Sequence, residues 1–181
     1  MSAFAMRALL GLALAAAPLA AARADDDILK HIINNPNVNA ISLNGQAKSF
    51  FVKDANVQGG MALEIKVPGA SANPWDIAAE SAVAGAIHKG DTVIGLVWLR
   101  CKNTDATPCQ VNVRIQGNTD PWPAVLQESE QVGSDWKTYT VQSVATQDFP
   151  KAGSAMDIHL ATGKQVIDVG PMFVLNMGPA Q

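Results

Sequence analysis

Residues 92–116 read TVIGLVWLRCKNTDATPCQVNVRIQ. The first ten residues are rich in β-branched and other large apolar side chains, and residues 111–116 alternate strictly between apolar and polar. Between them lies KNTDATP, a composition typical of turns. Because successive side chains of a strand point to opposite faces, this stretch predicts two strands over 92–101 and 110–116, each with one apolar face directed to a core.

The same organisation extends along the rest of the chain. Short β-rich runs are separated by Gly, Pro, Asn and Asp clusters at near-regular spacing, and no segment after residue 25 has a convincing helical period. This pattern is typical of an antiparallel β-sandwich or a barrel. The predicted strands cover residues 38–43, 49–53, 62–67, 75–82, 92–101, 110–116, 124–129, 137–144, 155–161 and 165–176.

The first 24 residues have the composition of a secretory signal peptide. Arg7 precedes an uncharged run over 8–22, and the run ends in the small-x-small sequence of residues 22–24. A membrane span is disfavoured, because the run is shorter than the roughly 20 residues that a bilayer requires and Pro18 interrupts it. We expect cleavage after Ala24, and a single secreted or periplasmic domain over 25–181 that does not insert into a membrane.

The charge of the chain narrows the class of partner. Removal of a leader that contains Arg7 and Arg23 and no acidic residue leaves 11 basic and 16 acidic residues, a net charge of −5. Nucleic-acid binding depends on neutralising phosphates, so an acidic domain without a basic stripe argues against a nucleic-acid partner. It argues equally against an anionic membrane surface.

The chain has two cysteines, Cys101 and Cys109. Their spacing is too wide for a CxxC redox motif, and zinc sites usually have four ligands. In an exported protein such a pair indicates a disulfide. We predict that it closes the mouth of a hairpin formed by 92–101 and 110–116, and that it contributes about 2–3 kcal/mol to stability.

The polar side of the alternating strands contains the candidate ligand contacts. Arg, Gln and His can form directional hydrogen bonds, and a Trp on a solvent face is unusual unless something covers it. The alternation therefore predicts one polar, aromatic face shared by three strands, although an ordinary solvated sheet face is the alternative. The predicted face comprises Trp98, Arg100, Arg114, Gln116 and His159, with Asn112 and Asp157 beside them.

Catalytic signals are few. The sequence contains no GxSxG elbow, no phosphate-binding glycine loop and no His pair at metal-ligand spacing. Glycoside hydrolysis needs two opposed carboxylates, and the sequence places none of its acidic residues in a pair. We therefore expect a protein that is not an enzyme, and a small glycoside hydrolase is the less favoured alternative.

The tryptophans indicate a sugar ligand. Sugars present flat C–H faces to aromatic rings and hydroxyls to planar polar groups, so Trp combined with Arg, Gln and Asp suits a polysaccharide or oligosaccharide. Trp75 and Trp122 both lie in proline-bounded loops near strand ends. We predict that both rings contact the sugar.

Five segments resemble the carbohydrate-binding modules of the cellulose- and xylan-binding type, which are galactose-binding-like jelly rolls. These segments are NPWD at 73–76, KGDTV at 89–93, WLR at 98–100, SDWKTY at 134–139 and IHL at 158–160. The resemblance implies a two-sheet antiparallel β-sandwich whose concave sheet binds a glycan. By position it implies that Trp98, Arg100, Arg114, Gln116 and His159 lie on or beside that sheet, with Trp75 and Trp122 at its rim.

Two departures from the family pattern bear on partners and cofactors. Family members commonly hold a structural calcium through an acidic residue of the last strand, often in an Asp-Asp pair. This chain has a single, shifted Asp168, which argues against calcium, and we expect no other cofactor. We expect no catalytic domain beside the module, so the resemblance implies glycan capture, assistance to a separate glycan-degrading enzyme, or a protein-interaction role in the cell envelope.

Overall fold

The computed structural model describes residues 28–105 and 107–180. The predicted signal peptide and its cleavage site lie outside the described residues. The chain divides into two units, residues 1–30 and 31–181, and the strands of the described residues belong to the second. In the described part, no helix is both long and apolar enough to cross a bilayer.

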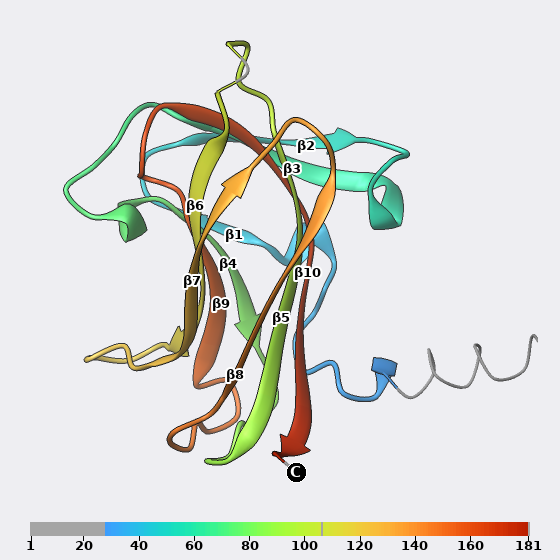
Figure 1. Cartoon of the computed structure of the whole chain (residues 1–181), viewed down its shortest axis with the longest axis vertical. Coiled ribbons are helices and arrows are strands. Elements are labelled where there is room, and N and C mark those ends of the chain that lie inside the picture. Colours follow the sequence, from blue (N-terminus) through green and yellow to red (C-terminus); the bar gives the residue numbers. More distant parts are fainter. Residues whose placement is uncertain (1–27, 106, 181) are drawn as a thin grey trace, which may run out of the picture. The chain divides into compact units, whose positions relative to one another are not determined.

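Ten strands of the described residues form two five-stranded antiparallel sheets (Figure 1). Sheet I has the order β1-β4-β9-β6-β7, and sheet II has the order β2-β3-β10-β5-β8. Sheet I consists of β1 (Ser42–Asn44), β4 (Ala78–Val83), β9 (Ser154–His159), β6 (Cys109–Gly117) and β7 (Ala124–Val132). Sheet II consists of β2 (Lys48–Lys53), β3 (Met61–Val67), β10 (Gln165–Pro179), β5 (Asp91–Cys101) and β8 (Lys137–Val144). The predicted two-sheet antiparallel β-sandwich is confirmed.

The core lies between the sheets and follows the predicted alternation. In β5 every second residue from Asp91 to Cys101 is buried, and in β6 the buried positions include Val111, Val113 and Ile115. Strand β9, which lies between β4 and β6 in the middle of sheet I, is buried along its whole length. The hydrophobic effect on these apolar faces holds the sheets together.

Two predicted strands begin as short 3-10 helices. Residues 38–43 open with η1 (Val38–Ala40), where the Asn37 side chain accepts a hydrogen bond from the backbone N–H of Asn39. Residues 75–82 open with η3 (Pro74–Asp76), which a capping box between Asn73 and Asp76 stabilises. In both segments, side chain to backbone hydrogen bonds favour a turn over a strand. A third 3-10 turn, η2, covers Gln58–Gly60.

The disulfide between Cys101 and Cys109 is confirmed, with a Cα–Cα distance of 5.4 Å. The predicted hairpin is wrong. Strand β5 pairs with β10 and β8 of sheet II, whereas β6 pairs with β7 and β9 of sheet I. The loop from β5 to β6 therefore passes from one sheet to the other, and the disulfide joins the two sheets at that crossing.

The predicted single polar face is wrong for the same reason. Both strands direct their apolar residues into the shared core, so their polar residues point outward on opposite sides of the sandwich. Trp98 and Arg100 lie on the outer face of sheet II. Arg114 and Gln116 lie on the outer face of sheet I.

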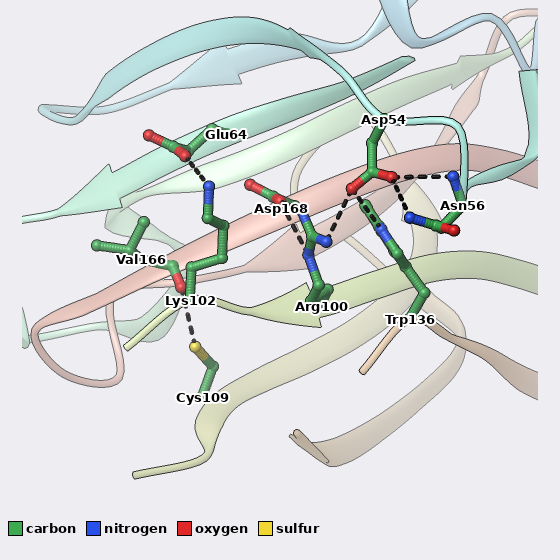
Figure 2. Close-up of polar contacts among 9 residues, drawn as sticks. All are labelled: Asp54, Asn56, Glu64, Arg100, Lys102, Cys109, Trp136, Val166 and Asp168. Atoms are coloured by element: carbon green, nitrogen blue, oxygen red, sulfur yellow. Dashed lines mark hydrogen bonds and ion pairs between the residues drawn. The ribbon is translucent and has the colours of Figure 1, made fainter. Parts of the chain in front are cut away.

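On sheet II, Arg100 and Trp98 take part in local contacts, and Figure 2 shows those of Arg100. The Arg100 guanidinium forms ion pairs with Asp54 at 2.8 Å and Asp168 at 2.5 Å, and it stacks on the Trp136 ring at 4.7 Å. The Trp98 indole N–H donates to the Gln58 side chain at 3.2 Å. The donors of Arg100 and Trp98 are thus engaged within the protein itself, which is the pattern of a structural network.

Candidate functional site: a groove on sheet I

A groove of about 560 Å³ lies on the outer face of sheet I. Strands β1, β4, β9 and β6 contribute its floor, and the turn at η3 and the loop after β6 contribute its sides. It is lined by Asn44, Trp75, Ala78, Glu80, Arg114, Gln116, Pro121, Trp122, Asp157 and His159.

Strand register explains why the floor is polar. Glu80 of β4 stands directly opposite Asp157 of β9, which stands directly opposite Arg114 of β6. Direct cross-strand partners have Cβ atoms about 4.5–5.5 Å apart, so these three side chains form a continuous row across the sheet. In the neighbouring outward-facing row, His159 of β9 lies opposite Asn112 of β6. The Asn44 amide of β1 donates to the Glu80 carboxylate at 3.0 Å.

Trp75 forms one side of the groove. The residue is 56% exposed, and its ring makes an edge-on contact with the His159 ring, with centroids 6.2 Å apart. The capping box of η3 holds the turn that carries it, because the Asp76 carboxylate accepts from the backbone N–H of Asn73 and from the Ser71 hydroxyl. An exposed indole on a fixed turn offers a flat apolar surface to a ligand.

Trp122 forms the other side and is 49% exposed. Its backbone adopts a left-handed conformation with φ of 57°, which is uncommon for a bulky residue and is tolerated where surrounding contacts impose it. The Trp122 N–H donates to the Thr119 carbonyl at 2.7 Å, and the Trp122 carbonyl accepts from Arg114 at 2.7 Å. Arg114 therefore anchors the loop to the floor of the groove.

Asp157 is the buried carboxylate of the floor, with 3% of its surface exposed. Burial raises its pKa to about 7, the neighbouring charge of Glu80 adds to the increase, and Gln116 and Arg114 oppose it. The Oδ2 atom of Asp157 is buried and has no hydrogen-bond partner. Buried polar groups are nearly always paired, so this oxygen is an unpaired acceptor at the groove floor.

His159 and Arg114 complete the electrostatics. His159 is also 3% exposed, and burial, with a smaller effect of the Arg114 charge, lowers its pKa to about 4. It is therefore a neutral ring near pH 7, able to donate from one nitrogen and accept at the other. The buried Nε of Arg114 also has no hydrogen-bond partner, so the floor holds one unpaired donor and one unpaired acceptor.

Five of the seven predicted contact residues meet in this groove, namely Trp75, Arg114, Gln116, Trp122 and His159. Trp98 and Arg100 do not, because they belong to the opposite sheet. The predicted contact set omitted Asn44, Glu80 and Asp157. Alternation along 155–161 placed Asp157 on the outward face, but the roles of Asn44 and Glu80 depend on which strands pair, and no local pattern reports that.

The described residues do not fit the calcium that the resemblance raised. Asp168 is fully buried in the last strand, and its carboxylate receives the Arg100 guanidinium, so a positive charge already lies where a cation would bind. The described residues also contain no group of three or more His, Cys, Asp or Glu that could hold a metal ion.

Comparison with known proteins gives no match to a protein-family model and no match to a curated protein sequence. Solved structures do match. One is described as a CBM4 structure, with a TM-score of 0.61 and 16% identity over 76% of this chain and 95% of the other. The chain has the fold of a carbohydrate-binding module.

Two further structures support the same fold. The CBM22-1 xylan-binding domain of Paenibacillus barcinonensis Xyn10C matches with a TM-score of 0.58 and 13% identity, over 83% of this chain and 94% of that domain. The second N-terminal cellulose-binding domain of Cellulomonas fimi β-1,4-glucanase C matches with a TM-score of 0.58 and 16% identity. The match covers 85% of this chain and 95% of that domain. The predicted resemblance to cellulose- and xylan-binding modules is thus confirmed at the level of the fold.

Proposed function

We propose that the protein is a non-catalytic carbohydrate-binding module that holds a polysaccharide or oligosaccharide in the groove of sheet I. One observation carries the proposal: two exposed indoles flank a floor whose buried Asp157 oxygen and Arg114 nitrogen lack partners. The indoles match the apolar faces of sugar rings, and the floor offers both acceptors and donors to hydroxyl groups. The fold supports it, because structural neighbours of this chain are described as cellulose- and xylan-binding domains.

The proposal is tested by calorimetry or affinity electrophoresis with soluble neutral glycans, starting with xylan and β-glucan. We expect Trp75→Ala and Trp122→Ala each to weaken binding about tenfold or more, because buried aromatic contacts dominate most interfaces. Trp98→Ala is the matched control, since it removes an indole from the opposite sheet and is expected to leave affinity unchanged. Absence of binding to every neutral glycan would refute the proposal, as would an equal loss in Trp98→Ala.

The proposal includes export. Support comes from the leader-like first 24 residues and from the disulfide, which forms in oxidising compartments. The exported protein is expected to begin at Asp25, and N-terminal sequencing of material from the periplasm or medium tests this. An intact Met1 in that fraction, or retention of the protein in the cytoplasm, would contradict it.

One observation favours a second candidate, glycoside hydrolysis. Asp157, with a pKa raised to about 7, lies beside Glu80, and glycosidases use one protonated and one ionised carboxyl group. Chromogenic glycosides test this directly. Turnover that both Asp157→Asn and Glu80→Gln abolish would establish an enzyme, whereas binding without turnover leaves the non-catalytic proposal in place.

A further inference from the structure

A second groove, of about 700 Å³, lies at one end of sheet II and belongs to no function described above. It is formed where β2 and β10 begin and where β3 and β5 end. Four lysines line it: Lys48, Lys66, Lys102 and Lys164. We call it the lysine groove.

The sheet register brings three of these lysines into one row. Lys48 of β2 stands directly opposite Lys66 of β3, and Lys66 stands directly opposite Val166 of β10. The backbone N–H of Lys102 donates to the Val166 carbonyl at 2.7 Å, which continues the row to the end of β5. Like charges directly opposite each other on a sheet are destabilising, so this row is unfavourable unless anions offset it.

Carboxylates of the protein neutralise the positive charge of the lysine row only in part. Figure 2 shows the Lys102 side chain directed at Glu64. That single carboxylate accepts from Lys102 at 2.7 Å and from Lys66 at 3.2 Å, so one negative charge serves two positive ones. Within the described ranges, Lys48 and Lys164 form no ion pair. With Asp105, the other carboxylate at the groove, the local net charge is +2 in a chain whose formal charge is −3.

The residues that line the lysine groove also indicate which kind of ligand can bind there. It contains no aromatic ring, so it lacks the stacking surface that Trp75 and Trp122 give to sheet I. A nucleic acid is disfavoured, because single strands bind through base stacking and duplexes through extended basic surfaces. Charge is the main attraction that the lysine groove offers.

We propose that the lysine groove binds an anionic polysaccharide, a chain of uronic acid units whose carboxylates contact the lysine row. Neighbouring strands lie about 4.8 Å apart, a spacing close to the length of one sugar ring. An extended polyuronate laid across the strands passes over Lys48 and Lys66 and, beyond β10, over Lys102, so its carboxylates come within reach of the lysine row. This site is distinct from the neutral-glycan groove of sheet I and lies on the other sheet.

The test uses the purified protein with polygalacturonate and with a neutral glycan, by affinity electrophoresis at low and high salt. We expect the double variant Lys48→Gln/Lys164→Gln to bind polygalacturonate about tenfold more weakly and with a reduced salt dependence. Both lysines are exposed and unpaired, so the fold is retained, and unchanged neutral-glycan binding checks this. Lys89→Gln/Lys151→Gln is the matched control, since it removes the same charge from exposed positions away from the lysine groove.

Each other outcome is decisive. Absence of polygalacturonate binding at low salt, or an equal loss in the control double variant, overturns the proposal, because the attraction is then absent or merely general. Loss of polygalacturonate binding in Trp122→Ala overturns it by placing the anionic chain on sheet I. Binding to dextran sulfate but not to polygalacturonate also overturns it, because sulfate and not carboxylate is then the recognised group. Failure with neutral glycans alone refutes only the function proposed for sheet I.

Discussion

At the scale of single residues, Asp157 and His159 show that burial shifts the pKa values of neighbouring acidic and basic groups in opposite directions. They lie two positions apart on β9, on the same face, and both are almost fully buried. Burial disfavours the charged form of each, which raises the pKa of the carboxyl group to about 7 and lowers that of the imidazole to about 4. Near neutral pH the groove floor therefore holds a neutral imidazole and a carboxyl group close to its midpoint.

Asp157→Asn is predicted to change stability in a pH-dependent way. The Asp157 carboxyl group binds a proton more readily in the folded state than in the unfolded state. Its contribution to the stability of the fold is therefore complete below pH 4 and is lost as pH rises toward 7. The free energy of unfolding changes through this one group by at most about 1.4 kcal/mol per pH unit. Relative to the wild type, the Asn variant should thus be least stable near pH 4 and gain as pH rises to 8, measured by urea unfolding.

Other groups around Asp157 do not obscure this comparison. His159 changes the free energy of unfolding with pH in the opposite direction, because its lowered pKa removes stability as pH falls from about 6.5 toward 4. The wild type and the variant both contain His159, so this effect cancels in the comparison. Glu80 and Arg114 are also common to both proteins. Asp135→Asn, at an exposed position in the turn before β8, is the matched control and is measured over the same pH range. A pH-independent difference for Asp157→Asn would contradict the burial argument.

At the scale of elements, one side chain ties the sheets together. Asn34 is buried and donates to the Ser81 hydroxyl of β4 in sheet I and to the Met172 carbonyl of β10 in sheet II, each at 2.8 Å. It also accepts from the Val174 N–H at 2.8 Å. The segment before β1 is therefore held between the sheets by hydrogen bonds and not by apolar packing alone.

Asn34→Ala is predicted to destabilise the fold by roughly 2–4 kcal/mol, because it leaves buried backbone groups of Met172 and Val174 without partners. Chemical denaturation measures the loss. Asn39→Ala, at an exposed position whose side chain makes no hydrogen bond among the described residues, should cost under about 0.5 kcal/mol. Equal losses in the two variants would show that the bridge contributes nothing specific.

Most of these elements were predictable, since ten strands were expected and ten are found among the described residues. Strand 137–144 has the predicted bounds, and 92–101 and 110–116 differ from β5 and β6 by single residues at their ends. The starts of 38–43 and 75–82 were wrong, because Asn37 and the capping box at Asn73 favour turns there. Period-2 alternation reports that a strand exists, but it does not report its partner.

At the scale of the whole molecule, the disulfide joins two sheets and closes a short loop. Replacing both cysteines by alanine is predicted to lower the free energy of unfolding by about 2–3 kcal/mol, mainly through the entropy of the unfolded chain. Binding to the groove of sheet I should be unaffected, because neither cysteine lines it. Denaturation of oxidised wild type and variant measures the loss, and no change in stability would contradict it.

The sandwich also separates the two proposed sites. The groove of sheet I offers indoles and hydrogen-bonding groups, and the lysine groove of sheet II offers charge. Polar residues that looked equivalent along the sequence were divided between the groove of sheet I and the structural network of Arg100, because β5 and β6, which follow each other in sequence, belong to different sheets. This division explains why five of the seven predicted contact residues came together and two did not.

The sequence by itself determined the β class, the inward faces of the strands at 92–101 and 110–116, and the disulfide, because apolar alternation and cysteine chemistry are local properties of the chain. Only the tertiary structure decided which outward residues meet. Glu80, Asp157 and Arg114 form one row because β4, β9 and β6 pair, and the lysine row forms because β2, β3 and β10 pair. Strand pairing is set by how the sheets close over a common core, and that depends on the whole chain at once.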